Sequence, residues 1–246
     1  MKISVAIITL NAAKELDRCL ASVAFADQVV VLDQNSSDDT VEVCARHGVE
    51  IHQTKWLGFG LTKNKAVSLC RNPWVLSVDT DEVVTEELKQ AIENLPEDTA
   101  TAAFTVNRLS RFLGSWIHHC GWHPEHVVRL FHRERAGFND LPVHESIETE
   151  GAVARLSGLL HHHTYESMEQ YIEKLNRYTT LAAEEMHGKG QSIVLPLAVV
   201  RSQATFWRMW ILQGGIFDGW AGFVLCLSSS FYVLSKYTKL WRMGDR

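Results

Sequence analysis

The sequence ISVAIIT at residues 3–9 and the sequence QVVVLD at residues 28–33 decide the fold. Both are continuous apolar runs rich in β-branched residues, which is typical of strands buried on both faces of a parallel sheet. We expect the intervening helix to begin near Asn11, whose side chain is a suitable N-cap. The helical spacing of apolar residues that supports it involves Leu16, Cys19, Leu20 and Val23.

The alternation of strands and helices continues through the first 80 residues. Gly48 is the expected end of the second helix. The further helices are predicted over residues 41–47 and 62–70, and the further strands over residues 49–52 and 74–78. Such alternation predicts a parallel, doubly wound α/β sheet with right-handed crossovers.

The pattern changes after residue 100. Strands are predicted over residues 102–108, 127–132 and 152–161, and helices over residues 166–187, 195–212 and 219–234. These ranges predict a second half of mixed strands and helices, followed by a helical extension. The last range carries no charge over 16 residues, which is short for a membrane span of about 20 residues.

Composition excludes several classes of protein. The 246 residues are 46% apolar and 22% charged, as in ordinary globular proteins, so collagen-like, disordered and mini-protein classes are excluded. The formal charge of −5 divides into −9 for residues 1–198 and +4 for residues 199–246. An acidic body with a basic, aromatic tail argues against nucleic-acid binding and suits contact with an anionic membrane surface. Five cysteines without a C-x-x-C pair suggest neither a disulfide framework nor a zinc ribbon.

Polar residues follow the predicted strands at the edge where open α/β sheets bind ligands. Thr9 and Asn11 follow the first strand, and Asp33 ends the second. Asp33 is placed to accept hydrogen bonds from a nucleobase or a ribose, although an aspartate here also serves as a turn cap. Asp79 and Asp81 follow the strand at residues 74–78, and in an irregular turn both carboxylates can reach one divalent cation.

Three common motifs are absent from the sequence. No G-x-G-x-x-G follows the first strand, and neither a G-x-x-x-x-G-K-[ST] phosphate loop nor a G-x-S-x-G elbow occurs. A phosphate-bearing ligand must therefore be held by metal, side chains and loops. A nucleotide-diphosphate donor with a divalent ion is the simplest fit.

Four motifs in the first 85 residues resemble glycosyltransferase family 2. They are VAIITLN (5–11), VVVLDQNSSDDT (29–40), KWLGFGLTKNKA (55–66) and VLSVDTDE (75–82). The later motifs RLFHR (129–133), LPVHESI (141–147) and LLHHHTY (159–165) are similar to the bacterial branch that includes WaaE-type lipopolysaccharide core β-glucosyltransferases. The resemblance implies the GT-A fold, an α/β fold with a Rossmann-like, mostly parallel central sheet flanked by helices, followed here by the C-terminal extension.

The resemblance also implies roles for particular residues. It implies nucleotide binding by Thr9, Asn11, Asp33, Lys63, Asn64 and Asp79. It implies a divalent cation, Mn²⁺ or Mg²⁺, on Asp79, Asp81 and His162. Alternation in a strand would turn His161 and His163 away from His162, and a histidine triplet can also be a polar edge.

Inverting transfer needs a carboxylate that removes a proton from the acceptor hydroxyl. Glu145 is the candidate, in a loop between predicted strands, with Asp140 as second choice; Glu145 is also suited to cap a turn or pair with Arg129. Arg129 in turn suits a contact with Glu145 or with a phosphate. His144 and Trp122 are candidate acceptor contacts, and a Trp at this density can equally fill a core.

The resulting hypothesis is a metal-assisted inverting enzyme. It would move a sugar, glucose by preference, from a UDP-sugar to a lipopolysaccharide inner-core or other lipid-linked saccharide, at the cytoplasmic face of the bacterial inner membrane. Residues 1–190 would be the catalytic domain, with a nucleotide-binding half (1–100) and an acceptor half (101–165). Residues 191–246 would form interfacial helices or a helical pair for packing or dimerisation. The alternatives are a sugar nucleotidyltransferase, which lacks support because no Gly-rich basic loop follows the first strand, and an inactive membrane scaffold.

Overall fold

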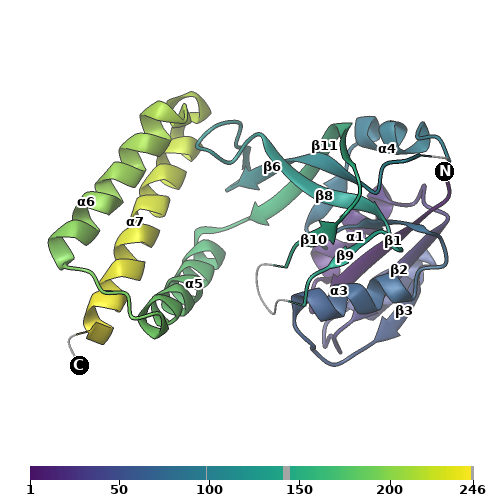
Figure 1. Ribbon diagram of the computed structural model, residues 1–246, viewed down its shortest axis with the longest axis horizontal. Helices are drawn as coiled ribbons and strands as arrows, with labels where there is room; N and C mark the ends of the chain where they lie inside the picture. The colour runs from purple at the N-terminus through teal and green to yellow at the C-terminus, as the bar shows by residue number, and fades with distance from the viewer. Residues whose placement is uncertain (98, 141–144, 245–246) are drawn as a thin grey trace. The chain divides into compact units, whose positions relative to one another are not determined.

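The computed structural model describes residues 1–97, 99–140 and 145–244. The chain divides into two compact units (Figure 1). Among the described residues, two clusters of buried apolar side chains lie in the first unit and one lies in the second. The first unit comprises Met1–Arg108 and Glu125–His162, and the second comprises Leu109–Pro124 and His163–Arg246.

Four parallel strands form one half of the sheet in the first unit. In sheet order they are β3 (Glu50–Gln53), β2 (Gln28–Asp33), β1 (Ile3–Thr9) and β4 (Trp74–Ser77). The helices between them are α1 (Ala13–Ser22), α2 (Thr40–His47) and α3 (Phe59–Ser68). Alternate β1 side chains enter two cores: Val5 packs with the core of α1, and Ala6 packs with the core of α3. Burial on both faces explains why β1 is rich in apolar residues, whereas the edge strand β3 contains Glu50, His52 and Gln53.

Antiparallel strands extend the sheet beyond β4. They are β8 (Glu125–His132), β6 (Ala103–Phe112), β11 (Val153–Tyr165) and β5 (Glu82–Val84), and β7 (Ser115–Trp116) pairs with β6. The remaining elements of this region are α4 (Glu86–Glu93) and the two-stranded sheet of β9 (Ala136–Phe138) and β10 (Ile147–Thr149). The predicted α/β class is confirmed, and the parallel strands lie in the N-terminal half of the chain.

The predicted cap of α1 is wrong. The N-cap position is Ala12, without a side-chain cap hydrogen bond. Asn11 instead has a positive φ of 49°, and its Oδ1 accepts a hydrogen bond of 2.8 Å from the Ser37 amide. The amide side chain therefore ties the end of β1 to the loop after β2. The predicted end of α2 is confirmed, because Gly48 adopts the left-handed conformation with φ 63°.

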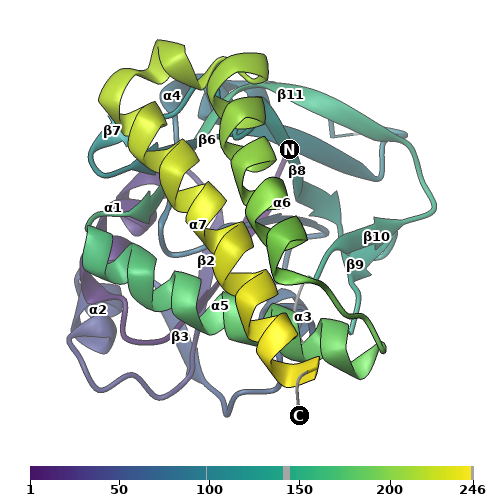
Figure 2. The same cartoon turned by 90° about the vertical axis from the view of Figure 1, so that its left-hand side faces the viewer.

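Helices dominate the second unit (Figure 2). They are α5 (Met168–Gly188), α6 (Leu195–Trp207), the π-helical turn η1 (Arg208–Leu212), the 3₁₀ turn η2 (Gly215–Asp218) and α7 (Gly219–Gly244). Between α6 and α7 the buried Ser202 and Ser230 hydroxyls lie 2.8 Å apart. One stretch, Gly215–Gly244, is long and apolar enough to cross a membrane by length and composition.

Candidate active site

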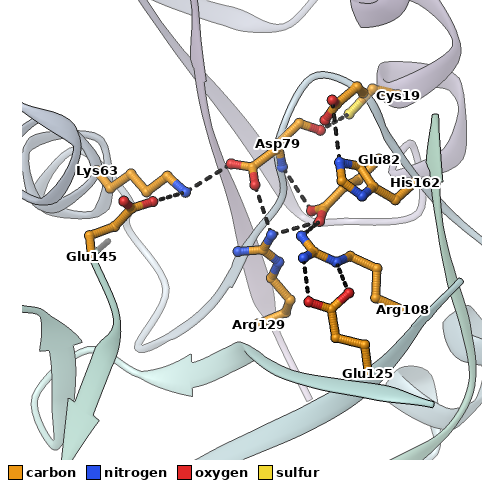
Figure 3. Close-up of polar contacts among 10 residues, drawn as sticks. Cys19, Lys63, Asp79, Glu82, Arg108, Glu125, Arg129, Glu145 and His162 are labelled. Carbon is orange, nitrogen blue, oxygen red and sulfur yellow. Dashed lines mark hydrogen bonds and ion pairs between the residues drawn. The ribbon is translucent and has the colours of Figure 1, made fainter. Parts of the chain in front are cut away.

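Asp79 is the centre of a charged cluster just after β4 (Figure 3). Its Oδ1 lies 2.9 Å from Nζ of Lys63, which comes from α3. Its Oδ2 lies 2.7 Å from Nη2 of Arg129, which comes from β8. Because α3 leads into β4 and β8 pairs with β4, the fold delivers one cation to each oxygen of this carboxylate.

Lys63 joins this cluster to the predicted base. Its Nζ is 2.8 Å from Oε1 of Glu145, so one ammonium group contacts two carboxylates. Only 6% of the Lys63 side chain and 17% of the Glu145 side chain are exposed. Lys63 Nζ also lies over the ring of Phe138, 5.4 Å from its centroid. The partner found for Glu145 is therefore Lys63 rather than Arg129.

Three further charged residues lie around Asp79 and its partners, and the sequence predicts no role for them. Glu82 is fully buried, and its Oε2 accepts a hydrogen bond of 3.0 Å from the Asp79 amide. Its Oε1 accepts from Nη2 of Arg129 at 2.6 Å and from Nη1 of Arg108 at 3.3 Å. Arg108 is in turn held by both oxygens of Glu125, at 2.9 and 2.7 Å. A charged residue directly after an Asp-x-Asp motif was the available signal for Glu82.

The charges fix the ionisation of this cluster. Burial opposes the ionised form of Asp79, but the positive charges of Arg129 and Lys63 outweigh it, so the pKa of Asp79 lies well below its ordinary value. Burial likewise opposes the charge of Arg129, and the carboxylates of Glu82 and Asp79 raise the pKa of Arg129 above its ordinary value. Asp79 is therefore a carboxylate and Arg129 a cation throughout the physiological pH range.

The side chains around Asp79 are of the kinds that bind divalent cations. Asp79 and Asp81 supply carboxylate oxygens, and Nε2 of His162 lies 3.4 Å from Oδ2 of Asp81. The neighbouring His163 packs its ring against Trp116, with 5.4 Å between centroids. Within the described residues, no three His, Cys, Asp or Glu side chains meet closely enough to hold a metal. Both oxygens of Asp79 already contact positive charge, so Lys63 and Arg129 would oppose a cation that binds Asp79 and compete with it for the carboxylate.

The predicted nucleotide residues lie at the ends of β1 and β2. Thr9 is opposite Asp33 in the parallel register, and both side chains are buried. Oγ1 of Thr9 has no hydrogen-bond partner among the described residues, whereas Asp33 accepts hydrogen bonds from the amide and the hydroxyl of Ser36 at 3.0 and 2.5 Å. A buried hydroxyl that lacks a partner is suited to a bound ligand.

Three predicted residues remain, which are Asn64, Trp122 and His144. Asn64 is on α3, and its amide exchanges two hydrogen bonds with the backbone of Phe138, at 2.8 and 3.0 Å. Trp122 belongs to the second unit, where it packs edge-on against Phe112 in the core. His144 lies outside the described residues.

The sequence matches the model of a known protein family over more than half its length. Residues 4–155 match the family described as glycosyl transferase family 2. An uncharacterized glycosyltransferase of Rickettsia prowazekii is 25% identical over 257 residues, which cover 99% of this chain and 87% of that protein. The lipopolysaccharide core biosynthesis glycosyltransferase LpsC of Rhizobium meliloti is 25% identical over 256 residues, which cover 98% of this chain and 93% of that protein.

The fold also resembles a solved structure. The crystal structure of S. aureus TarS 1–349 in complex with UDP-GlcNAc aligns with a TM-score of 0.55 and 15% identity, covering 100% of this chain and 92% of TarS 1–349. At this identity the likeness shows a common fold.

Proposed function

Since the chain belongs to glycosyl transferase family 2 and has the GT-A fold of a glycosyltransferase, we propose that it transfers glucose from a UDP-sugar to a lipopolysaccharide inner-core saccharide or another lipid-linked saccharide. The observation that carries this proposal is the Lys63 bridge between Asp79, on the donor side, and Glu145, the candidate base. The LpsC likeness over nearly the whole chain supports the class of acceptor.

In this reaction Glu145 acts as the general base. The acceptor hydroxyl oxygen forms a bond to the anomeric carbon, the bond from that carbon to the diphosphate breaks, and the hydroxyl proton passes to the Glu145 carboxylate. Attack from the face opposite the leaving group inverts the anomeric centre. Lys63 keeps the carboxylate in one position, and the 17% exposure of the side chain leaves room for an incoming hydroxyl.

The donor would be held by the ends of β1 and β2 and by the Asp79 cluster. Asp33 would bind the base or ribose, and Thr9 and Asn11 would line the nucleotide. Lys63 would lie beside the diphosphate while its ammonium stays on Glu145, with Asn64 holding the nearby Phe138 backbone. A divalent cation held by Asp79, Asp81 and His162 would neutralise negative charge on the diphosphate.

A thermal-shift screen of nucleotide sugars, with and without Mn²⁺, tests this proposal. A donor at 100 times its dissociation constant is expected to stabilise the protein by about 2.7 kcal/mol. UDP and UDP-glucose should raise the melting temperature more than other nucleotides, and Mn²⁺ should increase the effect. The absence of a shift with any nucleoside diphosphate would contradict the assignment.

We further propose that the α6–α7 hairpin contacts the membrane peripherally at the cytoplasmic face. Small buried residues lie on these two helices, with Ala198 and Ser202 on α6 and Ser230 on α7, whereas large apolar side chains face outward. Close packing through small residues with apolar outer faces is typical of helices in lipid. Six large apolar residues that are at least half exposed lie near the turn between α6 and α7, and are Trp207, Ile211, Leu212, Ile216, Phe217 and Trp220. Basic residues at Arg201, Lys236 and Arg242 suit anionic headgroups, whereas Lys239 Nζ is held by Oδ1 of Asn176 in α5 at 2.8 Å.

A further inference from the structure

Lys63 occupies an unusual place, because it is a nearly buried ammonium shared by carboxylates with different proposed tasks. Its Nζ is 2.9 Å from Asp79 Oδ1 and 2.8 Å from Glu145 Oε1 (Figure 3). Asp79 follows β4, whereas Glu145 lies just before β10. Among the described residues, no other side chain forms ion pairs with both carboxylates. The lysine is thus a physical link between the donor side and the base.

The two cations on Asp79 are not equivalent. Arg129 is also bound to the fully buried Glu82 at 2.6 Å, so its departure would leave a buried carboxylate with one cation fewer. Lys63 carries its charge on a flexible four-carbon stem, and its other partner, Glu145, is partly exposed. Lys63 is therefore the cation that can leave Asp79 at the smaller cost.

We propose that Lys63 is a positioning residue that neutralises Asp79 in place of a divalent cation and, when a cation binds Asp79, remains attached to Glu145. This inference rests on the proposed function, and it adds that occupation of the donor side and the position of the base are coupled through one side chain. The ring of Phe138, 5.4 Å from Nζ, supplies a further contact for the ammonium.

If Lys63 couples Asp79 and Glu145, substitutions of Lys63 and Glu145 should change the cation affinity in a way that the sum of their separate charge effects does not predict. Lys63→Met removes the competing ammonium, so the donor-free protein should bind Mn²⁺ about tenfold more tightly. Glu145→Gln releases the ammonium to Asp79 alone, so Mn²⁺ should bind several-fold more weakly. In the double variant the Glu145→Gln effect should disappear, because the side chain through which it acts is gone.

The experiment is a double-mutant cycle of Mn²⁺ affinity, measured by electron paramagnetic resonance from the loss of the free Mn²⁺ signal, with and without UDP. Lys65→Met is the matched control, because Lys65 lies on the same helix but donates to Thr54 Oγ1 at 2.7 Å. It should leave the Mn²⁺ affinity unchanged. Lys63→Arg, which retains the charge, should restore most of the wild-type affinity, and circular dichroism should verify that every variant is folded.

Kinetics give a second readout. Lys63→Met should lower kcat with a smaller change in KM for the donor, because the base loses its fixed position, and Lys63→Arg should recover part of kcat. Additive effects of Lys63→Met and Glu145→Gln on Mn²⁺ affinity would overturn the coupling while leaving the proposed function intact. Wild-type protein that binds neither Mn²⁺ nor UDP would overturn both.

Discussion

At the scale of single residues, the Asp79 site is organised by charge. Two arginines and one lysine face the carboxylates of Asp79, Glu82, Glu125 and Glu145 over distances of 2.6 to 3.3 Å. Each buried charge has partners of opposite sign, which is the condition under which burial of ions is tolerated. The loss of one charge therefore affects several neighbours.

Glu145→Gln tests the base directly. The amide retains the size of the side chain but cannot accept a proton, so kcat should fall by about 10² to 10⁴-fold. UDP binding, followed by thermal shift, should persist. Glu148→Gln on the neighbouring strand β10 is the control, since Glu148 is exposed and contacts Asn139. Full turnover in Glu145→Gln would show that another group takes the proton.

Asp79→Asn should change the acid stability of the protein. The pKa of Asp79 is depressed in the folded state, so its ionised form contributes stability that is fully present above the unfolded pKa of about 3.9. This contribution declines as the pH falls from there toward the depressed pKa of the folded state. The variant should be less stable at pH 7, because Lys63 and Arg129 lose their shared partner. Its stability should also fall less steeply below about pH 4.

Urea denaturation between pH 3 and pH 7 measures both effects of Asp79→Asn. Asp39→Asn, an exposed aspartate of the same unit, controls for the removal of a negative charge. Parallel stability curves for wild-type protein and Asp79→Asn would contradict the assigned role of the ion pairs.

At the scale of elements, β11 and α4 approach each other very closely. Gly158 in β11 has a positive φ of 87°, and a Cβ at this position would lie 2.4 Å from the backbone nitrogen of Leu88 in α4. A side chain here would both strain the strand and push against a helix backbone. The contact supports β5 and thereby Glu82, since β5 pairs with β11.

Gly158→Ala should destabilise the protein by about 2–5 kcal/mol, which combines overpacking with an unfavourable φ. Gly48→Ala separates the two terms, because Gly48 also has a positive φ, of 63°, but a Cβ at this position would meet no atom within 4 Å. It should cost about 1–2 kcal/mol. If urea denaturation shows that Gly158→Ala and Gly48→Ala lower the free energy of unfolding by equal amounts, α4 moves aside to make room for the added methyl group.

The parallel strands and their helices are predictable from sequence, whereas the antiparallel half is less so. β1 and β2 are mostly apolar because both faces are covered, and this signal is local. Arg108 and Glu125 become partners only through the register of β6 on β8, which no local pattern encodes. The three-residue strand β5 begins with the charged Glu82, so it lacks an apolar run.

The same distinction holds for the candidate site. Asp33, Asp79 and Asp81 follow strands and can be found by counting along the sequence. The Lys63 bridge to Glu145 depends on a contact over more than 80 positions, and the ion pair that the sequence suggested as an alternative for Glu145 was with Arg129. The cap prediction for Asn11 failed for a similar reason, because Ser37 competes for its amide oxygen.

At the scale of the whole molecule, the second unit combines a small-residue helix interface with an apolar exterior. Leu212, Phe217 and Trp220 are 81, 78 and 83% exposed. Large apolar side chains at such exposure in a soluble environment favour association with another surface. The proposed partner is a bilayer with anionic lipids.

The double variant Phe217→Glu/Trp220→Glu should weaken binding to vesicles of phosphatidylglycerol and phosphatidylethanolamine at least about tenfold, since each side chain contributes roughly 1.5–3 kcal/mol on burial. Sedimentation of the protein with these vesicles measures the binding. Leu57→Glu/Val153→Glu, two partly exposed sites in the first unit, adds the same charge and should have little effect. Unchanged sedimentation of Phe217→Glu/Trp220→Glu would favour protein packing or dimerisation for this hairpin.

Because the strand direction changes beside β4, segments of this enzyme cannot be exchanged freely with those of its relatives. β4 has a parallel neighbour on one side and the antiparallel β8 on the other, and Arg129 of β8 is the partner that crosses this border to Glu82 and Asp79. A chimera that replaces residues 101–165, the proposed acceptor half, with those of a relative must supply an arginine at the same register of β8. Without it, the fully buried Glu82 would lose its shortest ion pair, at a cost of about 3–5 kcal/mol. Exchange of this proposed acceptor half is therefore tied to the inheritance of one arginine that contacts Asp79.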